Sequence, residues 1–182
     1  MKKILVVVDM QNDFIDGALG TPEARGIVPN VCRKIREGEW VSIFTTHDTH
    51  LADYLNTQEG RKLPIEHCMV GTKGYSYNEE VSKALGEFRG YRLDFAKSTF
   101  GSKELHKFIH DSFDDAESDL EITLVGVCTD ICVISNALLL KTYLPEARIV
   151  VDASCCAGST PLKHDEALDV MRSCQIDIVG DW

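Results

Sequence analysis

The feature that most constrains the fold is a series of short apolar runs, rich in valine and isoleucine, that recur along the chain. They cover residues 4–8, 40–45, 91–95, 122–127, 148–151 and 176–179. Apolar runs without polar alternation are typical of strands buried on both faces, which is how the strands of a parallel sheet lie. The sequence therefore predicts a parallel sheet covered on both sides.

Helical patterns separate these runs, at residues 28–37, 79–88, 103–112, 130–143 and 163–174. Pro29 and Pro161 are taken as N-terminal signals of the first and last helices. The alternation predicts a doubly wound α/β fold with a mostly parallel six-stranded sheet and helices on both faces. The 182 residues, 44% of them hydrophobic, are enough for one core, so we expect a single domain over residues 1–182.

Composition excludes several classes of partner. The net charge of -10 repels a phosphate backbone, so no nucleic acid partner is expected. No apolar run is long enough to cross a bilayer, and Asp9 ends the first run too early for a signal peptide, so no membrane partner is expected. The seven cysteines are an odd number and lie mostly within apolar segments, which predicts reduced thiols and a cytoplasmic protein.

Polar side chains follow three of the predicted strands: Asp9, Lys97 and the turn at residues 128–132. An Asp after a strand usually caps a turn and a Cys in an apolar helix usually packs, but the carboxyl ends of parallel strands lie together, so all three can meet in one pocket. Cys132 falls in the first turn of a helix, where backbone N–H groups lower a thiol pKa. Those N–H groups can also hold an oxyanion, so the sequence predicts a cysteine nucleophile.

A second group of polar residues lies in the stretch at residues 47–77, which has no convincing periodicity. Asp48 and His50 are two residues apart after a strand, so their side chains point to the same side. His67 lies further along this stretch and can supply a third ligand. Two imidazoles and a carboxylate suit Zn²⁺, although Fe²⁺ or Mn²⁺ can bind to the same set. His47 points to the opposite side and is not expected to bind metal, and Cys68 is expected to pack.

Several segments resemble the cysteine hydrolases of the isochorismatase-like superfamily, most closely the nicotinamidases (pyrazinamidases). The segments are "LVVVDMQNDFIDGALG", "DFAKSTFGS", "GVCTDICV", "DTH", "EHCMVGTKG" and "DASCCAGSTP". Together they cover essentially the whole chain. Isochorismatases proper lack the last cysteine of the third segment, so its presence favours amide chemistry.

The resemblance implies that Asp9, Lys97 and Cys132 catalyse hydrolysis of a small carboxamide, nicotinamide being the best candidate, through a cysteine thioester. It also implies a cis peptide bond between Val127 and Cys128, which would turn the backbone N–H groups of Cys128 and Cys132 toward one oxyanion. Asp9 would act as the proton carrier, and Lys97 would keep it ionised.

The resemblance also implies the substrate contacts and the metal. Phe14 matches the aromatic residue that lies against the substrate ring, Leu63 and Phe100 are further candidates for substrate contact, and Asp48, His50 and His67 match the metal ligands. The chain departs from the nicotinamidases at residues 63–66, where they carry a tryptophan, and at residues 51–55, where a further histidine is often present. A homodimer or homotetramer is common in the superfamily.

Three alternatives to a metal-dependent amidase remain open. Hydrolases of carbamoyl or ureido compounds share the three catalytic residues but need no metal. Cys128 and Cys132 could form a thiol redox or sensing pair, although their C-x-x-x-C spacing is not the C-x-x-C of disulfide oxidoreductases. That redox reading would also leave Asp9 and Lys97 without a role, and the intact set of Asp9, Lys97 and Cys132 disfavours the third alternative, a catalytically dead binding protein.

Overall fold

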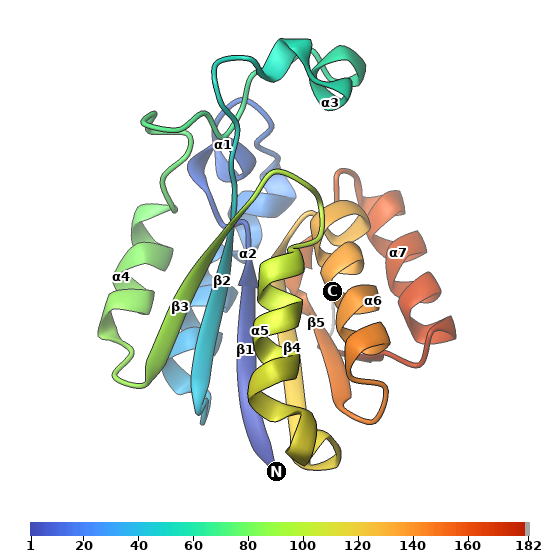
Figure 1. Cartoon of the computed structure of the whole chain (residues 1–182). Coiled ribbons are helices and arrows are strands. Elements are labelled where there is room, and N and C mark those ends of the chain that lie inside the picture. Colours follow the sequence, from blue (N-terminus) through green and yellow to red (C-terminus); the bar gives the residue numbers. More distant parts are fainter. Residues whose placement is uncertain (181–182) are drawn as a thin grey trace.

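A computed structural model, which describes residues 1–180, contains one sheet of six parallel strands in the order β3-β2-β1-β4-β5-β6 (Figure 1). The strands are β1 (Lys2–Val8), β2 (Ser42–Asp48), β3 (Tyr91–Lys97), β4 (Leu120–Val127), β5 (Arg148–Ala157) and β6 (Asp177–Val179). The doubly wound fold expected from the apolar runs is thus confirmed. Among these residues, the structure contains no helix with the length and apolar character needed to cross a membrane.

Helices cover both faces of the sheet. Those longer than eight residues are α2 (Pro22–Glu37), α4 (Glu79–Glu87), α5 (Lys103–Phe113), α6 (Ile134–Tyr143) and α7 (Pro161–Ser173). The short ones are α1 (Asn12–Ile15), η1 (Tyr54–Asn56), α3 (Gln58–Lys62), η2 (Asp114–Asp119) and the π-helical turn η3 (Thr129–Val133). In Figure 1, α5, α6 and α7 lie on one face, α2 and α4 lie on the other, and α3 projects above one edge of the sheet.

The strand β1 shows why the sheet is buried on both faces. Ile4, Val6 and Val8 pack in the apolar cluster under α5, α6 and α7, whereas Leu5 and Val7 pack in the cluster with α2 and α4. Successive side chains of a strand point to opposite faces, so an uninterrupted apolar run supplies both clusters.

The strand order reverses at β1, which has β2 on one side and β4 on the other. Ligands of open α/β sheets bind beyond the carboxyl ends of the strands at such a reversal. The backbones approach closely there: Gly126 pairs with Val8 and has φ of +121°, and a Cβ at Gly126 would collide with the carbonyl oxygen of Val8. A ligand site is therefore expected beyond the carboxyl ends of β1 and β4, where the two backbones are closely packed.

The first long helix begins earlier than predicted. Pro22, not Pro29, is its first residue, and the Thr21 hydroxyl caps it by accepting a hydrogen bond from the Ala24 backbone N–H at 3.0 Å. Thr–Pro at the cap and first helical position is a stronger start signal than a proline alone. Pro29 lies inside the helix.

Three other expectations need correction. The edge strands β3 and β6 are largely exposed, because each has a neighbour on one side only, and just Lys97 of β3 is fully buried. The stretch at residues 47–77 is not a plain loop, since it contains η1 and α3. The helix predicted at residues 130–143 begins with the π-helical turn.

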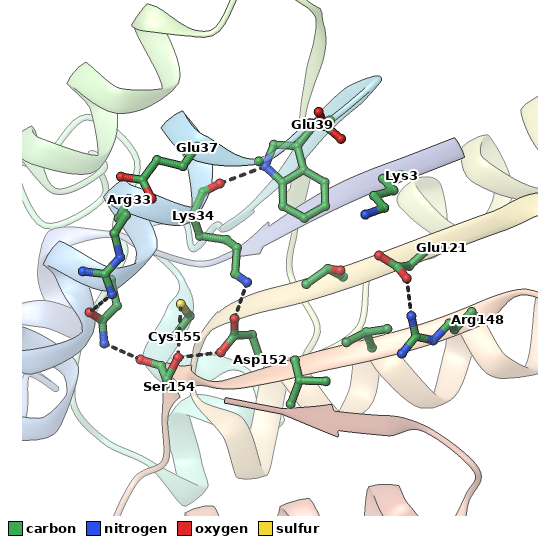
Figure 2. A pocket seen from close by; sticks show the side chains of 16 residues that line it. Lys3, Arg33, Lys34, Glu37, Glu39, Glu121, Arg148, Asp152, Ser154 and Cys155 are labelled. Atoms are coloured by element: carbon green, nitrogen blue, oxygen red, sulfur yellow. Dashed lines mark hydrogen bonds and ion pairs between the residues drawn. The ribbon is translucent and has the colours of Figure 1, made fainter. Parts of the chain in front are cut away.

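A polar cleft of about 630 Å³ lies between α2 and the strands β1, β4 and β5 (Figure 2). Four of its charged side chains form two ion pairs: Lys34 with Asp152 at 2.5 Å, and Arg148 with Glu121 at 2.5 Å. Ser154 also donates a hydrogen bond to Asp152 at 2.6 Å. The first pair joins α2 to β5, and none of the predicted site residues lines this cleft.

Candidate functional site

The predicted convergence of Asp9, Lys97 and Cys132 is present at the carboxyl edge of the sheet. The Lys97 ammonium lies 2.6 Å from the Asp9 carboxylate and 3.6 Å from the Cys132 sulfur. Asp9 directly follows β1, Lys97 ends β3, and Cys132 lies in η3 after β4. All three are buried. A carboxylate, an ammonium and a thiol in mutual contact can move a proton and form a covalent bond.

The Asp9 carboxylate is held in a fixed position. Its backbone φ is +49°, in the left-handed region that costs a non-glycine residue roughly 1–2 kcal/mol. The Thr46 hydroxyl donates a hydrogen bond to its other oxygen at 2.5 Å. Burial raises the pKa of Asp9 although the charge of Lys97 opposes this, and the neighbouring carboxylates keep the pKa of Lys97 above its usual value in spite of burial. Lys97 is therefore a permanent cation in the site.

The prediction that the helix start lowers the pKa of Cys132 is wrong. Burial and the Asp9 charge raise this pKa well above its usual value, and Lys97 opposes them only in part. The thiol rests protonated, so it needs a base, and Asp9 is next to it. Burial also raises the pKa of Cys128, to about 12, which argues against a thiol redox pair, because reactive thiols of that kind have lowered pKa values.

The turn that carries Cys132 is built as the resemblance implied. The peptide bond between Val127 and Cys128 is cis, and the carbonyl oxygen of Cys128 accepts hydrogen bonds from the backbone N–H groups of Ile131 and Val133, at 3.1 and 3.0 Å. The carbonyl of Cys128 is thus held inside the turn. A cis bond before Cys128 is a feature that periodicity in the sequence does not reveal.

Asn136 is a residue of this site that sequence reasoning missed. Its side chain donates hydrogen bonds to the carbonyl oxygens of Cys132 at 2.7 Å and Phe100 at 3.2 Å, and accepts one from the Ser102 backbone N–H at 3.1 Å. It therefore ties the turn after β4 to the loop after Lys97. An amide in the apolar run "ISNALL" was the available signal, since a buried amide needs partners.

Asp48, His50 and His67 come together as predicted, with possible ligand atoms within 4.8 Å of one another, and all three are buried. The Nδ1 atom of His67 lies 2.8 Å from the Ile65 carbonyl oxygen, which directs its Nε2 toward Asp48. The Nε2 of His50 is buried and lies 3.0 Å from the Asp48 carboxylate. Two imidazoles and a carboxylate, with His67 oriented by a backbone carbonyl, fit a divalent metal.

The sequence did not indicate two further residues that contact the metal group, which is the set of Asp48, His50 and His67. The Gln11 side chain holds the Asp48 backbone from both sides, accepting from its N–H at 2.7 Å and donating to its carbonyl at 2.8 Å. The Glu59 carboxylate lies 3.8 Å from His50 Nε2 and 3.9 Å from His67 Nε2. Burial alone would raise the pKa of Asp48, but hydrogen bonds from both histidines and the charge of Lys97 keep it below its usual value.

The two residues expected to lie outside the metal group do so. The His47 ring stacks on Tyr75 and lies against Tyr77, with centroids 4.9 and 3.8 Å apart, and points away from Asp48 as strand alternation requires. The Cys68 side chain is buried in the apolar cluster, and its backbone N–H donates a hydrogen bond to Asp13 at 2.8 Å. Cys68 therefore packs.

A cavity of about 300 Å³, the chamber, joins the thiol to the metal group. Phe14, Leu63 and Phe100, the three predicted substrate contacts, all line it together with Cys132 and His67. The Phe14 ring meets the His67 ring edge to face, with centroids 5.6 Å apart. An apolar chamber with a few convergent polar groups fits a small aromatic ligand.

The chain is similar to known nicotinamidases and pyrazinamidases. The family model described as "Isochorismatase domain" matches residues 3–180. Nicotinamidases of Schizosaccharomyces pombe and Saccharomyces cerevisiae are 22% and 21% identical, over 97% of this chain and 92% and 99% of theirs. The structures of a Pyrococcus horikoshii pyrazinamidase in complex with zinc and a Bacillus subtilis nicotinamidase/pyrazinamidase match with TM-scores of 0.75 and 0.78, at 26% and 25% identity. These two matches cover 100% and 98% of this chain and 100% of each of those chains.

Proposed function

The chain belongs to the isochorismatase-domain family, and from that membership and the geometry of the site we propose that it hydrolyses nicotinamide to nicotinic acid and ammonia. The observation that carries the proposal is the contact of Lys97 with both Asp9 and Cys132, 2.6 and 3.6 Å away, at a cysteine that lines the apolar chamber. A site of this composition suits acyl transfer through a cysteine.

The proposed reaction begins with proton transfer. Asp9 takes the proton of the Cys132 thiol as the sulfur attacks the carboxamide carbon, and Lys97 balances the charge that develops. Asp9 then gives this proton to the leaving nitrogen, the carbon–nitrogen bond breaks, and ammonia departs from a thioester. Asp9 next takes a proton from water, which attacks the thioester, and the acid leaves as Cys132 recovers its proton.

Two further parts complete the proposed mechanism. The backbone N–H groups of Cys128 and Cys132 stabilise the oxyanion of each tetrahedral intermediate. Asp48, His50 and His67 would hold a divalent ion, for which we propose zinc. When bound, this ion would act as a Lewis acid toward the ring nitrogen of the substrate. Phe14 orients the ring by packing against it.

The direct test is ammonia release from nicotinamide by the purified protein, together with metal analysis of the same sample. We expect Cys132→Ala to lower kcat/KM at least about 10³-fold, because it removes the sulfur that Lys97 contacts and that forms the thioester. Cys174→Ala is the matched control, since this cysteine is exposed and outside the chamber. Retained ammonia release by Cys132→Ala would refute the mechanism.

The same assay distinguishes the proposed amidase from the main alternative, a hydrolase of carbamoyl or ureido compounds. A hydrolase of carbamoyl or ureido compounds would release ammonia from those substrates without metal and would leave nicotinamide intact. The buried group of Asp48, His50 and His67 favours the metal-dependent amidase, because a hydrolase without metal has no use for it. Activity that survives complete removal of metal by a chelator would favour the alternative.

Assembly and compartment are also proposals. We propose a homodimer or homotetramer, as the family resemblance implies, and light scattering of the purified protein tests this. We further propose a cytoplasmic location, which is supported by seven cysteines that are all free of disulfide bonds. Fractionation of cells that produce the protein would test the compartment.

A further inference from the structure

The chamber shares a wall with a second and larger cavity. This cavity, which we call the side groove, has a volume of about 880 Å³. Four residues line both the chamber and the side groove: Glu59, Leu63, Phe100 and Ile131. The chamber has Asp48 and His67 on its wall, and the side groove has His50. The two cavities therefore meet beside the metal group.

The side groove has both apolar and charged side chains in its lining. Leu51, Tyr54 and Ala96 are among the apolar ones, and Asp53, Lys62 and Lys97 are among the charged ones. Leu51 is 63% exposed and Phe100 is 49% exposed, so apolar surface stands open next to the catalytic chamber. Apolar surface that is exposed and concave usually marks a binding site.

The position of Leu63 on the shared wall is determined by hydrogen bonds. The Tyr54 hydroxyl donates to the Leu63 carbonyl oxygen at 2.9 Å, and the Leu63 backbone N–H donates to the Glu59 carbonyl oxygen at 2.8 Å. Tyr54 itself is fully buried. The backbone of Leu63, a residue that borders both the chamber and the side groove, is thus held in place by the fold.

We infer that the side groove receives an apolar substituent of the substrate, so that the natural class of substrate is an aromatic carboxamide with an alkyl or aryl group on its ring. This inference rests on the proposed amidase function and extends it. A chamber of about 300 Å³ suffices for an unsubstituted pyridine amide, so the additional 880 Å³ beside it is not needed for that substrate. A ring held against Phe14 can direct a substituent past Leu63 and Phe100.

The experiment measures binding, so it does not depend on turnover. Protein carrying Cys132→Ala, which cannot form the thioester, is titrated in a calorimeter with nicotinamide and with ring-phenylated nicotinamides that differ in the position of the phenyl group. We expect at least one phenylated amide to bind about tenfold more tightly than nicotinamide, since apolar groups that fill a pocket give changes of this size. Equal or weaker binding of every phenylated amide would overturn the inference.

Two leucines of the same segment supply the matched variants. Leu51→Asp places a charge in the side groove and should abolish the tenfold preference, whereas Leu55→Asp, at a 47% exposed leucine that lines neither cavity, should retain it. A preference that survives Leu51→Asp would show that the phenyl group lies elsewhere and would refute the inference. Failure of the proposed hydrolysis is seen separately, as absent ammonia release by the protein with Cys132 intact.

Discussion

Replacing Lys97 with methionine tests the electrostatics of the site most directly. Methionine is unbranched like lysine, one atom shorter and uncharged, so the buried Asp9 carboxylate loses a cation 2.6 Å away. At an effective dielectric constant of about 20, two unit charges at this distance attract by about 6 kcal/mol. Desolvation offsets part of this attraction, and measured losses for one partner of a buried pair are about 3–5 kcal/mol. We expect a decrease of this size in the free energy of unfolding at neutral pH.

The effect of pH has a definite sign. Burial already raises the pKa of Asp9 above its ordinary value of 3.8, and removal of Lys97, which lowers it, raises it further. A carboxyl group with a raised pKa in the folded state stabilises the fold at low pH and loses this contribution as pH rises through that pKa. The difference in stability between the variant and the parent protein should therefore narrow as the pH falls from 7 to 5.

Urea unfolding followed by circular dichroism at both pH values measures this difference. Lys107→Met is the matched control, because Lys107 pairs with Asp111 at 2.5 Å in solvent, and we expect it to leave the unfolding midpoint nearly unchanged. Adding Asp9→Asn to Lys97→Met should restore much of the lost stability, because the uncompensated charge of Asp9 is then removed. Equal effects of the two lysine variants, or a loss that does not depend on pH, would refute the reasoning.

Three further predictions concern stability. Gly126→Ala should lower the free energy of unfolding by about 2 kcal/mol or more in the same urea assay, because its Cβ would collide with the Val8 carbonyl at a positive φ, whereas Gly86→Ala, at an open helical position, should not. Lys34→Met should cost about 1–3 kcal/mol by leaving Asp152 with Ser154 as its remaining polar contact, and an unchanged midpoint would contradict this. Burial lowers the pKa of His164 below 6.5, so its contribution to stability is present above pH 6.5 and is lost at lower pH. His164→Gln should flatten the decline of the midpoint between pH 7 and 5, and an identical pH profile would count against it.

The fold could be predicted from the sequence because the apolar runs and the alternation of strands and helices are local signals. The run at the start of β1 shows burial on both faces without reference to any other segment, and the alternation of strands and helices restricts the connections to a parallel, doubly wound sheet. The positions of Asp9, Lys97 and Cys132 after three strands then indicated one site, since parallel strands end at the same edge.

Local signals do not reveal which strand lies at an edge of the sheet. The exposure of β3 follows from the absence of a neighbouring strand beyond it. Glu59 and Asn136 lie at the site because α3 and α6, which are far apart in the chain, bring them there. Such contacts carry no periodic pattern in the sequence.

The amino-acid sequence by itself determined the sheet, its two apolar faces and the residue types at the strand ends, because these depend on the spacing of side chains along one segment. The tertiary structure alone decided that the Cys132 thiol rests protonated, that Lys97 contacts both partners, and that the chamber lies beside the side groove. The pKa of a buried group and the shape of a cavity are set by every segment that excludes water from them, and those segments are distant in the sequence.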